Sequence, residues 1–350
     1  MQSTISICVP TFNRATCLEN LLNNLLTIKA AHGVDIEICI SNNQSTDSTQ
    51  QVIEAWRQKL LLKVVTQPTN IGAAKNVIEV TRLVTGKWIL IIGDDDELIA
   101  TGFESLLAFV HAADENDWIL AGVANESGDE HLLGDLKPGL YEAKRFRRVL
   151  LRTGLYRYGF IGMHIYPASL RQQFFALSFQ EAQSWPHIAL FLRHLKGGRV
   201  RVLPGSVVKQ AAGGNELYWN PGDWVRISLR KINIIAEARK VMSNMRWFFY
   251  WLMLRELYSL EGIKSLILWK ILEPTDFRHR AFREFSSRYL LLGPLASLAT
   301  LHCAFLIIVM STPSFIFHLA FLLQGKQDFV QRHRALKEKL GNFDGVKRGL

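Results

Sequence analysis

The 350-residue sequence lacks the short motifs that mark several large enzyme classes. It has no GxxxxGK[ST] loop, and no GxGxxG follows its first apolar segment, so ATPases and dinucleotide-dependent dehydrogenases are disfavoured. It has only four cysteines, and no two of them have the CxxC spacing of a zinc site. Cys8 and Cys39 fall in predicted buried strands, where a free thiol packs as a small hydrophobic group. This cysteine usage is typical of a reducing compartment.

A secretory signal is also missing from the first residues. The apolar segment 5–9 reads as a strand and is far too short for the hydrophobic region of a signal peptide. We therefore expect the catalytic part of the chain to stay in the cytosol.

The charge is distributed unevenly along the chain. Residues 1–125 contain 8 basic and 14 acidic side chains, a net charge of −6, whereas residues 126–350 contain 33 and 17, a net charge of +16. Basic residues beside long apolar runs are typical of proteins at an anionic membrane surface. A nucleic-acid platform would place aromatic residues among polar ones, but here they sit in apolar runs. We therefore predict a membrane surface, and no nucleic acid, as a partner.

Short apolar segments alternate with helical patterns through the first hundred residues. Strands are predicted at 5–9, 36–40, 62–66 and 88–92, with helices near 49–59 and 73–83 and one after residue 15. Thr16 is predicted to cap that first helix, with Glu19 as its capping-box partner. This alternation predicts an α/β fold with a Rossmann-like, mostly parallel sheet. Further on, a helix is predicted at 102–112, strands at 118–123 and 160–165, and a helix after Pro186.

Three adjacent carboxylates follow the apolar run 88–92, at Asp94, Asp95 and Asp96. Neighbouring carboxylates repel one another, and a hard divalent cation removes that conflict. Mg²⁺ or Mn²⁺ prefers carboxylate oxygen and leaves positions open for substrate phosphates. The alternative is a solvated acidic turn.

Polar side chains also follow the first and second predicted strands. They include Thr11, Asn13 and Arg14 after the first strand, and Asn42, Asn43 and Asp47 after the second. Because ligands bind beyond the carboxyl ends of the strands in open α/β sheets, these groups and the aspartates outline a pocket for a nucleotide diphosphate.

Four segments at this spacing resemble the successive signatures of family 2 glycosyltransferases with the GT-A fold. They are VPTFNR (residues 9–14), SNNQSTD (41–47), NIGAAKN (70–76) and GDDDEL (93–98). The resemblance is strong over residues 4–110, weaker to about 240 and absent beyond. Within the family the chain looks like bacterial enzymes of O-antigen and capsule assembly, of the abequosyltransferase-like kind.

The resemblance implies a domain organisation. It places a GT-A domain at residues 1–245, with a nucleotide-binding half at 1–125 and an acceptor half at 126–245. A helical, apolar and basic membrane-associated region would occupy residues 246–350.

The resemblance also implies roles for individual residues. The nucleotide-sugar would contact Pro10, Thr11, Asn13, Arg14, Asn42, Asn43, Lys75, Asp94 and Asp95. Asp96 would be a direct metal ligand, and Asp94 and Asp96 would form the DxD pair.

The sequence departs from the family pattern at three positions, Asn42, Asn43 and Gly93. Asn42 and Asn43 are amides where the family usually has acidic residues facing the base, so the base stays open. Many relatives have aspartate where Gly93 stands, so the first carboxylate of the motif can be shifted by one.

Alternatives remain open for two side chains in these loops. Lys75 matches a basic position of the family or lies on a solvated helix face. Asp47 supports its loop or caps the next helix.

An inverting transferase needs a base that takes a proton from the acceptor hydroxyl. His187 stands close to the family's base position, and Glu181 is the nearest upstream carboxylate. A histidine titrating near neutrality or a carboxylate with a raised pKa can serve. The alternative for both residues is an ordinary structural role.

The rest of the chain is apolar and basic. Residues 209–224 are predicted to form a mobile loop with aromatic faces that covers a sugar, or else an ordinary surface loop. Residues 225–245 are predicted to form a basic amphipathic helix. Leu290 to Met310 is long enough to span a membrane, and basic residues flank it on both sides. Helices that dip into the membrane or lie on it meet that charge pattern better than a single span. The alternative is a buried hairpin of a soluble domain.

Together these observations predict an inverting, metal-dependent glycosyltransferase of bacterial surface polysaccharide (O-antigen, capsule or lipopolysaccharide) biosynthesis. It would move a sugar from a nucleotide-diphospho-sugar to a lipid-linked, undecaprenyl-type saccharide on the cytoplasmic side of the inner membrane. The alternative is a catalytically silent, membrane-attached subunit that binds nucleotide-sugar. A processive polysaccharide synthase is disfavoured, because the QxxRW motif of such relatives is missing.

Overall fold

The computed structural model describes residues 4–32, 36–125, 127–129, 133, 136–182, 185–210, 234–235 and 237–258. The chain divides into two compact units. The first comprises Met1–Gly214 with Lys240–Met245, and the second comprises Asn215–Arg239 with Arg246–Leu350. In the second unit the longest described element is helix α10, Arg246–Tyr258.

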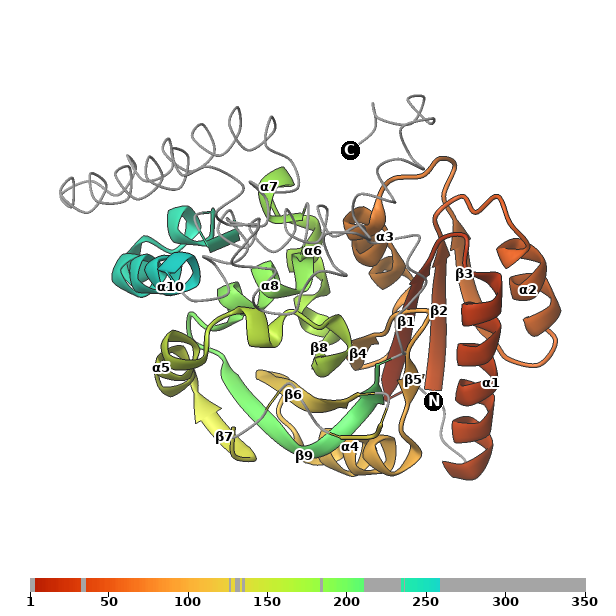
Figure 1. The fold of residues 1–350 in the computed structure, drawn as a ribbon, viewed down its shortest axis with the longest axis horizontal. Helices are drawn as coiled ribbons and strands as arrows, with labels where there is room; N and C mark the ends of the chain where they lie inside the picture. Colours follow the sequence, from red (N-terminus) through yellow and green to blue (C-terminus); the bar gives the residue numbers. More distant parts are fainter. Residues whose placement is uncertain are drawn as a thin grey trace, which may run out of the picture. The chain divides into compact units, whose positions relative to one another are not determined.

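The first unit begins with the alternation that the sequence predicts (Figure 1). The strands are β1 (Ile5–Thr11), β2 (Ile36–Asn42), β3 (Leu62–Thr66) and β4 (Trp88–Ile91). The helices between them are α1 (Ala15–His32), α2 (Thr49–Trp56) and α3 (Ala73–Val80), and α3 ends in the 3₁₀ turn η1 (Thr81–Leu83). All four strands are parallel to their neighbours in this set. The predicted βαβ organisation is therefore confirmed.

The second half of the unit extends the sheet with strands of both directions. They are β5 (Glu97–Leu98), β6 (Asp117–Ala124), β7 (Gly139–Glu142), β8 (His164–Pro167) and β9 (Arg199–Lys209). The strand order is β3-β2-β1-β4-β8-β6-β9-β5, with β7 also paired to β9. Four of the eight pairings between described strands are antiparallel. The prediction of a mostly parallel sheet is wrong, because β5, β7 and β8 each enter the sheet against their neighbours.

Helices and short turns complete this half. The helices are α4 (Ala100–Ala112), α5 (Ala143–Thr153), α6 (Arg171–Phe175), α7 (Phe179–Ala182) and α8 (Pro186–His194). The 3₁₀ turns are η2 (Tyr156–Tyr158), η3 (Ile161–Met163), η4 (Ala168–Leu170) and η5 (Ser243–Met245). The strand predicted at 160–165 keeps only its last two residues, since η3 occupies 161–163.

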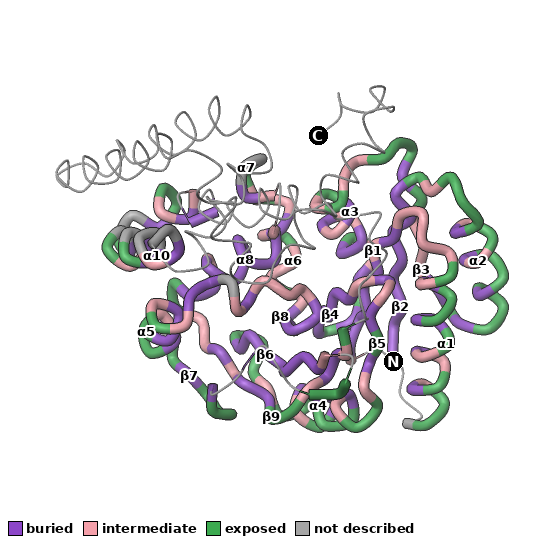
Figure 2. The backbone as a smooth tube through the Cα atoms, in the orientation of Figure 1, coloured by how far each residue is buried: buried purple, intermediate pink, exposed green. Residues whose placement is uncertain are grey.

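The main apolar core lies between the sheet and helices α1, α2 and α4 (Figure 2). Alternate residues of β1 enter it, namely Ile5, Ile7 and Val9, and they pack with the apolar stripe of α1. The other face of β1 and β2 carries smaller and more polar groups. Cys8 and Cys39 are neighbours across the two strands there, and both are buried free thiols, as predicted.

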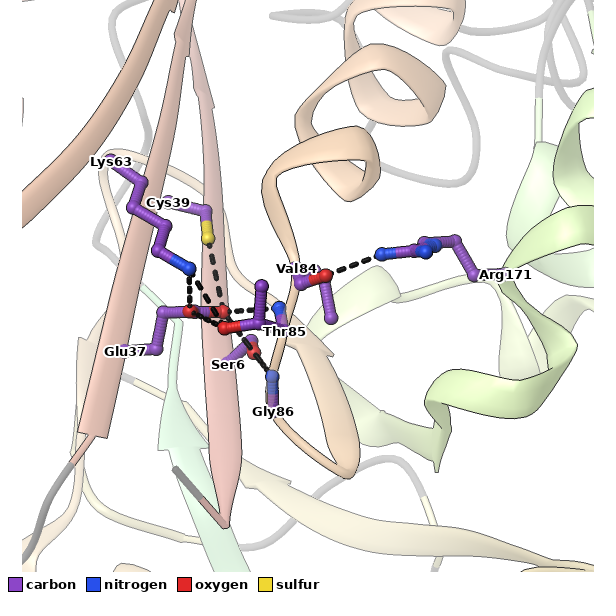
Figure 3. A network of polar contacts seen from close by, with 8 residues as sticks. All are labelled: Ser6, Glu37, Cys39, Lys63, Val84, Thr85, Gly86 and Arg171. Atoms are coloured by element: carbon purple, nitrogen blue, oxygen red, sulfur yellow. Dashed lines mark hydrogen bonds and ion pairs between the residues drawn. The ribbon is translucent and has the colours of Figure 1, made fainter. Parts of the chain in front are cut away.

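Glu37 organises a buried polar network at the amino ends of these strands (Figure 3). Its carboxylate accepts hydrogen bonds from Ser6 Oγ at 2.5 Å and from the backbone N–H of Thr85 at 2.8 Å. It also pairs with Lys63 Nζ and accepts from the Thr85 hydroxyl. The pKa of Glu37 would be raised by burial, but the hydrogen bonds from Lys63, Ser6 and Thr85 outweigh burial and lower it to about 2. The network joins β1, β2 and β3 to the segment that leads into β4.

Several predicted features lie wholly or partly outside the described residues. They are the loop at 209–224 apart from its first two residues, residues 225–233 and 236 of the helix at 225–245, and the apolar run at 290–310. No helix within the described ranges is both long enough and apolar enough to cross a membrane.

Candidate functional site

The strand order places a topological switch between β1 and β4. The chain leaves β1 toward β2 and β3, and then returns to the opposite side of β1 at β4. Open α/β sheets bind ligands at the carboxyl ends of the strands at such a point. The residues that end these two strands are Thr11 and the start of the aspartate loop.

Thr11, Arg14 and Asp94 are joined directly at this switch. The Thr11 hydroxyl donates to Asp94 Oδ2 at 2.6 Å, and Arg14 Nη1 donates to Asp94 Oδ1 at 3.0 Å. The same Arg14 nitrogen lies 2.5 Å from Asp95 Oδ2. Residues about 80 positions apart in the sequence thus form one charged cluster. Two predicted loops, after β1 and after β4, meet as expected.

Burial controls the protonation of this cluster. It raises the pKa of Asp94 to about 6, against the opposing effects of Arg14 and the Thr11 hydroxyl. Burial also lowers the pKa of Arg14, but the charges of Asp94 and Asp95 outweigh it, so that this pKa lies above its ordinary value. Arg14 therefore stays a cation beside the two carboxylates.

Asp95 and Asp96 converge over Gly93. A Cβ atom built on Gly93 would lie 2.7 Å from Asp96 Oδ2 and 2.8 Å from Asp95 Oδ1. A side chain at this position would force the two carboxylates away, so the departure from the family pattern at Gly93 has a steric reason. Asp96 is also buried.

This geometry is compatible with a hard cation. Mg²⁺ commonly uses one or two carboxylates and completes its shell with substrate phosphates and water. Asp95 and Asp96 present two such oxygens. Within the described ranges no group of three or more histidine, cysteine or acidic side chains is arranged to hold a metal.

Both carboxylate oxygens of Asp94 are engaged. One accepts from Thr11 and the other from Arg14. The geometry therefore gives no support for Asp94 as a metal ligand, and that role stays a prediction. Asp94 does lie at the β1–β4 switch, where the sequence placed it.

Asn42 and Asn43 hold the polar loops together. Asn42 Oδ1 accepts from the N–H of Ser45 at 3.0 Å, and its Nδ2 donates to Gln50 at 2.9 Å. Asn43 Oδ1 accepts from the N–H of Ile71, and its Nδ2 donates to Asn70, both at 2.9 Å. A carboxylate cannot make these donations, so the amides are required locally. Their predicted contact with a base stays a prediction.

Asp47 links the starts of two helices. Its Oδ2 accepts from the N–H of Ala15 at 3.2 Å, and its Oδ1 accepts from the N–H of Thr49 at 3.0 Å. Asp47 thus supports its loop and also accepts a hydrogen bond from the first residue of each of the helices α1 and α2. The predicted cap of α1 is wrong, because α1 begins at Ala15 and Thr16 lies inside it.

The remaining predicted nucleotide residues lie around the same edge or on α3. Asn13 is held in a left-handed conformation, with φ of 52°, and its Oδ1 accepts from the N–H of Thr46 at 2.7 Å. Pro10 is half-buried near the end of β1. Lys75 is exposed on α3, which does not choose between a ligand contact and a solvated face.

His187 is the second residue of α8, and its side chain is buried. Its Nε2 lies 3.0 Å from the carbonyl of Gly159, and its Nδ1 is buried without a hydrogen-bond partner. Since a carbonyl only accepts, Nε2 carries the proton and Nδ1 keeps its lone pair. Burial, together with the nearby His164, holds the pKa of His187 well below its ordinary value. His187 is thus a neutral imidazole with one unsatisfied acceptor.

The segment that follows Gly159 lies beside the strand that ends at the aspartate loop. Gly159 precedes η3, which packs against β4, the strand that ends at the aspartate loop. The backbone group that holds His187 therefore belongs to the segment beside that strand.

Glu181, the other candidate base, is fully engaged. Its two oxygens accept from Arg193 Nε at 3.0 Å and Nη2 at 2.7 Å, and one also accepts from the N–H of Ser178 at 2.9 Å. The carboxylate is completely buried and ties α7 to α8. A structural role accounts for every contact of Glu181, and its predicted catalytic role stays a prediction.

Two supporting residues were missed in the sequence. Asn24 of α1 donates through Nδ2 to the carbonyl of Leu98 at 3.1 Å, and its Oδ1 accepts from the Leu98 N–H at 2.9 Å. It thereby fixes the backbone two residues after Asp96. His164 accepts from Trp118 Nε1 at 3.0 Å and faces His187, with ring centroids 5.2 Å apart. A polar residue beside the apolar stripe of α1 was the only sequence signal for Asn24.

Comparisons with known proteins point to one family. Residues 6–172 match the family described as Glycosyl transferase family 2. Over 96 residues the chain is 38% identical to abequosyltransferase RfbV of Salmonella typhimurium, covering 27% of this chain and 28% of that protein. Over 106 residues it is 30% identical to poly(ribitol-phosphate) beta-N-acetylglucosaminyltransferase TarS of Staphylococcus aureus, and this segment covers 30% of this chain and 18% of that protein. The matched segment therefore spans less than a third of either relative.

Solved structures extend the likeness to the fold. The structure of S. aureus TarS 1–349 matches with a TM-score of 0.51 at 17% identity, over 99% of this chain and 95% of that one. Its complex with UDP matches with a TM-score of 0.51 at 18% identity, over 98% of this chain and 93% of that one. At this identity the match shows a shared α/β fold with a mixed sheet.

Proposed function

We propose that this protein transfers a sugar from a nucleotide-diphosphate donor to a saccharide acceptor, because residues 6–172 match the Glycosyl transferase family 2 model. The observation that carries the proposal is the cluster of Thr11, Arg14 and the three aspartates at the β1–β4 switch. It places a cation and convergent carboxylates where the fold binds ligands.

The donor is a nucleoside diphosphate sugar. Structures of the fold relative TarS are complexes with UDP and with UDP-GlcNAc. Arg14 supplies a fixed positive charge for a diphosphate, and the loops after β1 and β2 supply polar side chains for the nucleoside. We assign no base, because the side chains of Asn42 and Asn43 are already hydrogen-bonded within the protein.

Asp95 and Asp96 would hold a Mg²⁺ or Mn²⁺ ion against the donor diphosphate. Such an ion, when bound, offsets the negative charge that develops on the leaving diphosphate. Asp94 holds Arg14 in place, and Arg14 adds a second positive charge on the same side. Asn24 fixes the backbone that follows these carboxylates.

His187 is the base in this proposal, which requires its buried Nδ1 to open to the acceptor hydroxyl when the acceptor binds. Its neutral Nδ1 takes the proton of the acceptor hydroxyl as that oxygen attacks the anomeric carbon, and the diphosphate leaves from the opposite side with inversion. The Gly159 carbonyl holds the tautomer that this step requires. A positioned base of this kind contributes roughly 10²–10⁴-fold to the rate.

The acceptor is a lipid-linked, undecaprenyl-type saccharide of bacterial O-antigen or related surface polysaccharide synthesis, met on the cytoplasmic side of the inner membrane. The proposal is supported by the 38% identity to an abequosyltransferase and by the net charge of +16 over residues 126–350. The 21-residue apolar run at 290–310 also supports it.

The test compares two neighbouring acidic substitutions. Asp96→Ala should abolish metal-stimulated transfer while the protein keeps its thermal unfolding temperature, and Glu97→Ala, at an exposed neighbour, should leave transfer intact. Donors are screened with UDP-, GDP-, CDP- and dTDP-sugars and Mn²⁺. Unchanged transfer by Asp96→Ala would exclude the mechanism.

The second candidate function is a catalytically inactive subunit that binds nucleotide-sugar. Amides at Asn42 and Asn43 and glycine at Gly93 stand where relatives carry carboxylates, and this observation favours it. Such a protein would bind donor and metal in calorimetry yet give no product with any lipid-linked acceptor.

A further inference from the structure

Helix α5 carries a basic face on the surface of the first unit. Its eleven residues include five basic and no acidic side chains. Lys144, Arg148 and Arg152 recur at every fourth position, and these three and Arg145 are exposed. We call these four residues the α5 basic face. The opposite face is buried and consists of Ala143, Phe146, Val149 and Leu150 (Figure 2).

The α5 basic face is unfavourable for the helix by itself. Lys144 and Arg145 lie in the first turn, where the helix dipole disfavours positive charge. Lys144 with Arg148, and Arg148 with Arg152, are like-charged pairs at i and i+4, which destabilise a helix. Within α5 itself no acidic side chain compensates these charges, and Glu142 lies just before the helix. An anionic surface against this face would reverse the sign of each of these effects.

Other contacts fix α5 to the body of the protein. Phe146 packs edge-on against Tyr141, Tyr158 and Phe191. Arg147, the fifth basic residue, donates to the carbonyl of Leu195 at the end of α8. The exposed cations therefore stand on a rigid support rather than on a mobile segment.

We propose that the α5 basic face docks the protein on an anionic phospholipid bilayer. The inference rests on the proposed function, in which the acceptor is lipid-linked. From Lys144 to Arg152 the row is about 12 Å long at the rise of an α-helix. A bilayer offers many diffuse negative charges to such a row, and each cation near the surface adds to the attraction.

A nucleic acid fits this face less well than a bilayer does. Binding of single strands uses exposed aromatic side chains for stacking, and the one aromatic residue of α5, Phe146, is buried. The sequence also carries the apolar run at 290–310 with arginines and lysines on both sides, which is a second feature suited to a membrane.

The experiment measures co-sedimentation of the full chain with two kinds of vesicle, pure phosphatidylcholine and phosphatidylcholine with 30% phosphatidylglycerol. The test variant is Lys144→Glu, Arg145→Glu, Arg148→Glu and Arg152→Glu together. The matched control reverses four basic residues elsewhere on the unit, with the same change in net charge. They are Lys29, Arg57, Lys59 and Lys87. Thermal unfolding checks that both variants fold.

The expected result is a preference of the wild type for phosphatidylglycerol vesicles of roughly 10²–10³-fold at low salt. The test variant loses this preference, and the control keeps it. Weak binding to pure phosphatidylcholine is the same for all three, because it does not depend on these charges.

Three results would overturn the proposal. They are a test variant that keeps the preference, a control that loses it equally, and a test variant that loses binding to soluble polyphosphate but not to vesicles. The last result would assign the face to an anionic polymer. Transfer to a lipid-linked saccharide in detergent solution, measured on the same proteins without vesicles, separates this proposal from the proposed function. If transfer fails in the wild type, the proposed function is wrong, whatever the vesicles show.

Discussion

Replacing Glu37 with glutamine should make the folding stability of this protein much less sensitive to acid. In the folded chain the pKa of Glu37 is lowered to about 2 from its usual value of 4.5. Each pKa unit corresponds to about 1.4 kcal/mol, so the ionised carboxylate contributes about 3 kcal/mol to the free energy of unfolding at neutral pH. Because the folded pKa is the lower one, this contribution is complete above pH 4.5 to 5. It is lost as the pH falls toward 2.

The assay is urea unfolding followed by tryptophan fluorescence at pH 7 and pH 3. From the same pKa values, about 2 kcal/mol of the contribution disappears between these pH values in the wild type and none in Glu37→Gln. The stability difference between the two proteins should therefore shrink by about 2 kcal/mol. Glu54→Gln is the matched control, since Glu54 forms an exposed ion pair with Arg57 and should behave like the wild type. A difference that is constant with pH would refute the assignment of the network around Glu37.

Three further outcomes test the site. Gly93→Ala should lower metal-dependent transfer by at least about tenfold with little change in unfolding temperature, because the new Cβ displaces the carboxylates of Asp95 and Asp96; kcat/KM against Mn²⁺ concentration measures it. Glu181→Ala removes the carboxylate partner of the partly buried Arg193, whose contacts with the Ala176 carbonyl remain, and should cost about 3 kcal/mol in urea unfolding; a stable but inactive variant would instead indicate catalysis. His187→Gln should lower kcat by roughly 10²–10⁴-fold with an unchanged donor KM. In the wild type kcat should be flat from pH 7 to 9, since the pKa of His187 lies well below 6.5; an activity that falls as the pH drops from 9 to 7 would contradict this.

The first half of the fold could be predicted because its signals are local. Each strand from β1 to β4 is a short apolar run, and each helix between them has its own stripe, so boundaries came within a few residues. The later strands depend on partners far along the chain. β9 begins with alternating arginine and valine, but Pro204 and Gly205 interrupt it, and the pairing with β6 shifts register nearby. Its place in the sheet is set by tertiary pairing rather than by its own pattern.

The site shows the same limit. The sequence placed Thr11, Arg14 and the aspartates at one edge, since parallel strands end together. It could not show which carboxylate meets Arg14, because that depends on side-chain directions across about 80 residues. Nor could it show that Arg193 occupies both oxygens of Glu181. Proximity in sequence therefore identified the right elements but could not separate a catalytic group from a structural one.

The contact of Arg14 with Asp94 and Asp95 has a consequence for how the protein is assembled. The guanidinium is a resident counter-ion that the chain brings to its own acidic loop during folding. Mutual repulsion of the carboxylates is thereby reduced before any solution ion arrives. If transfer depends on a metal ion as proposed, folding and metal binding are separate events, so a chelator should abolish transfer without unfolding the protein.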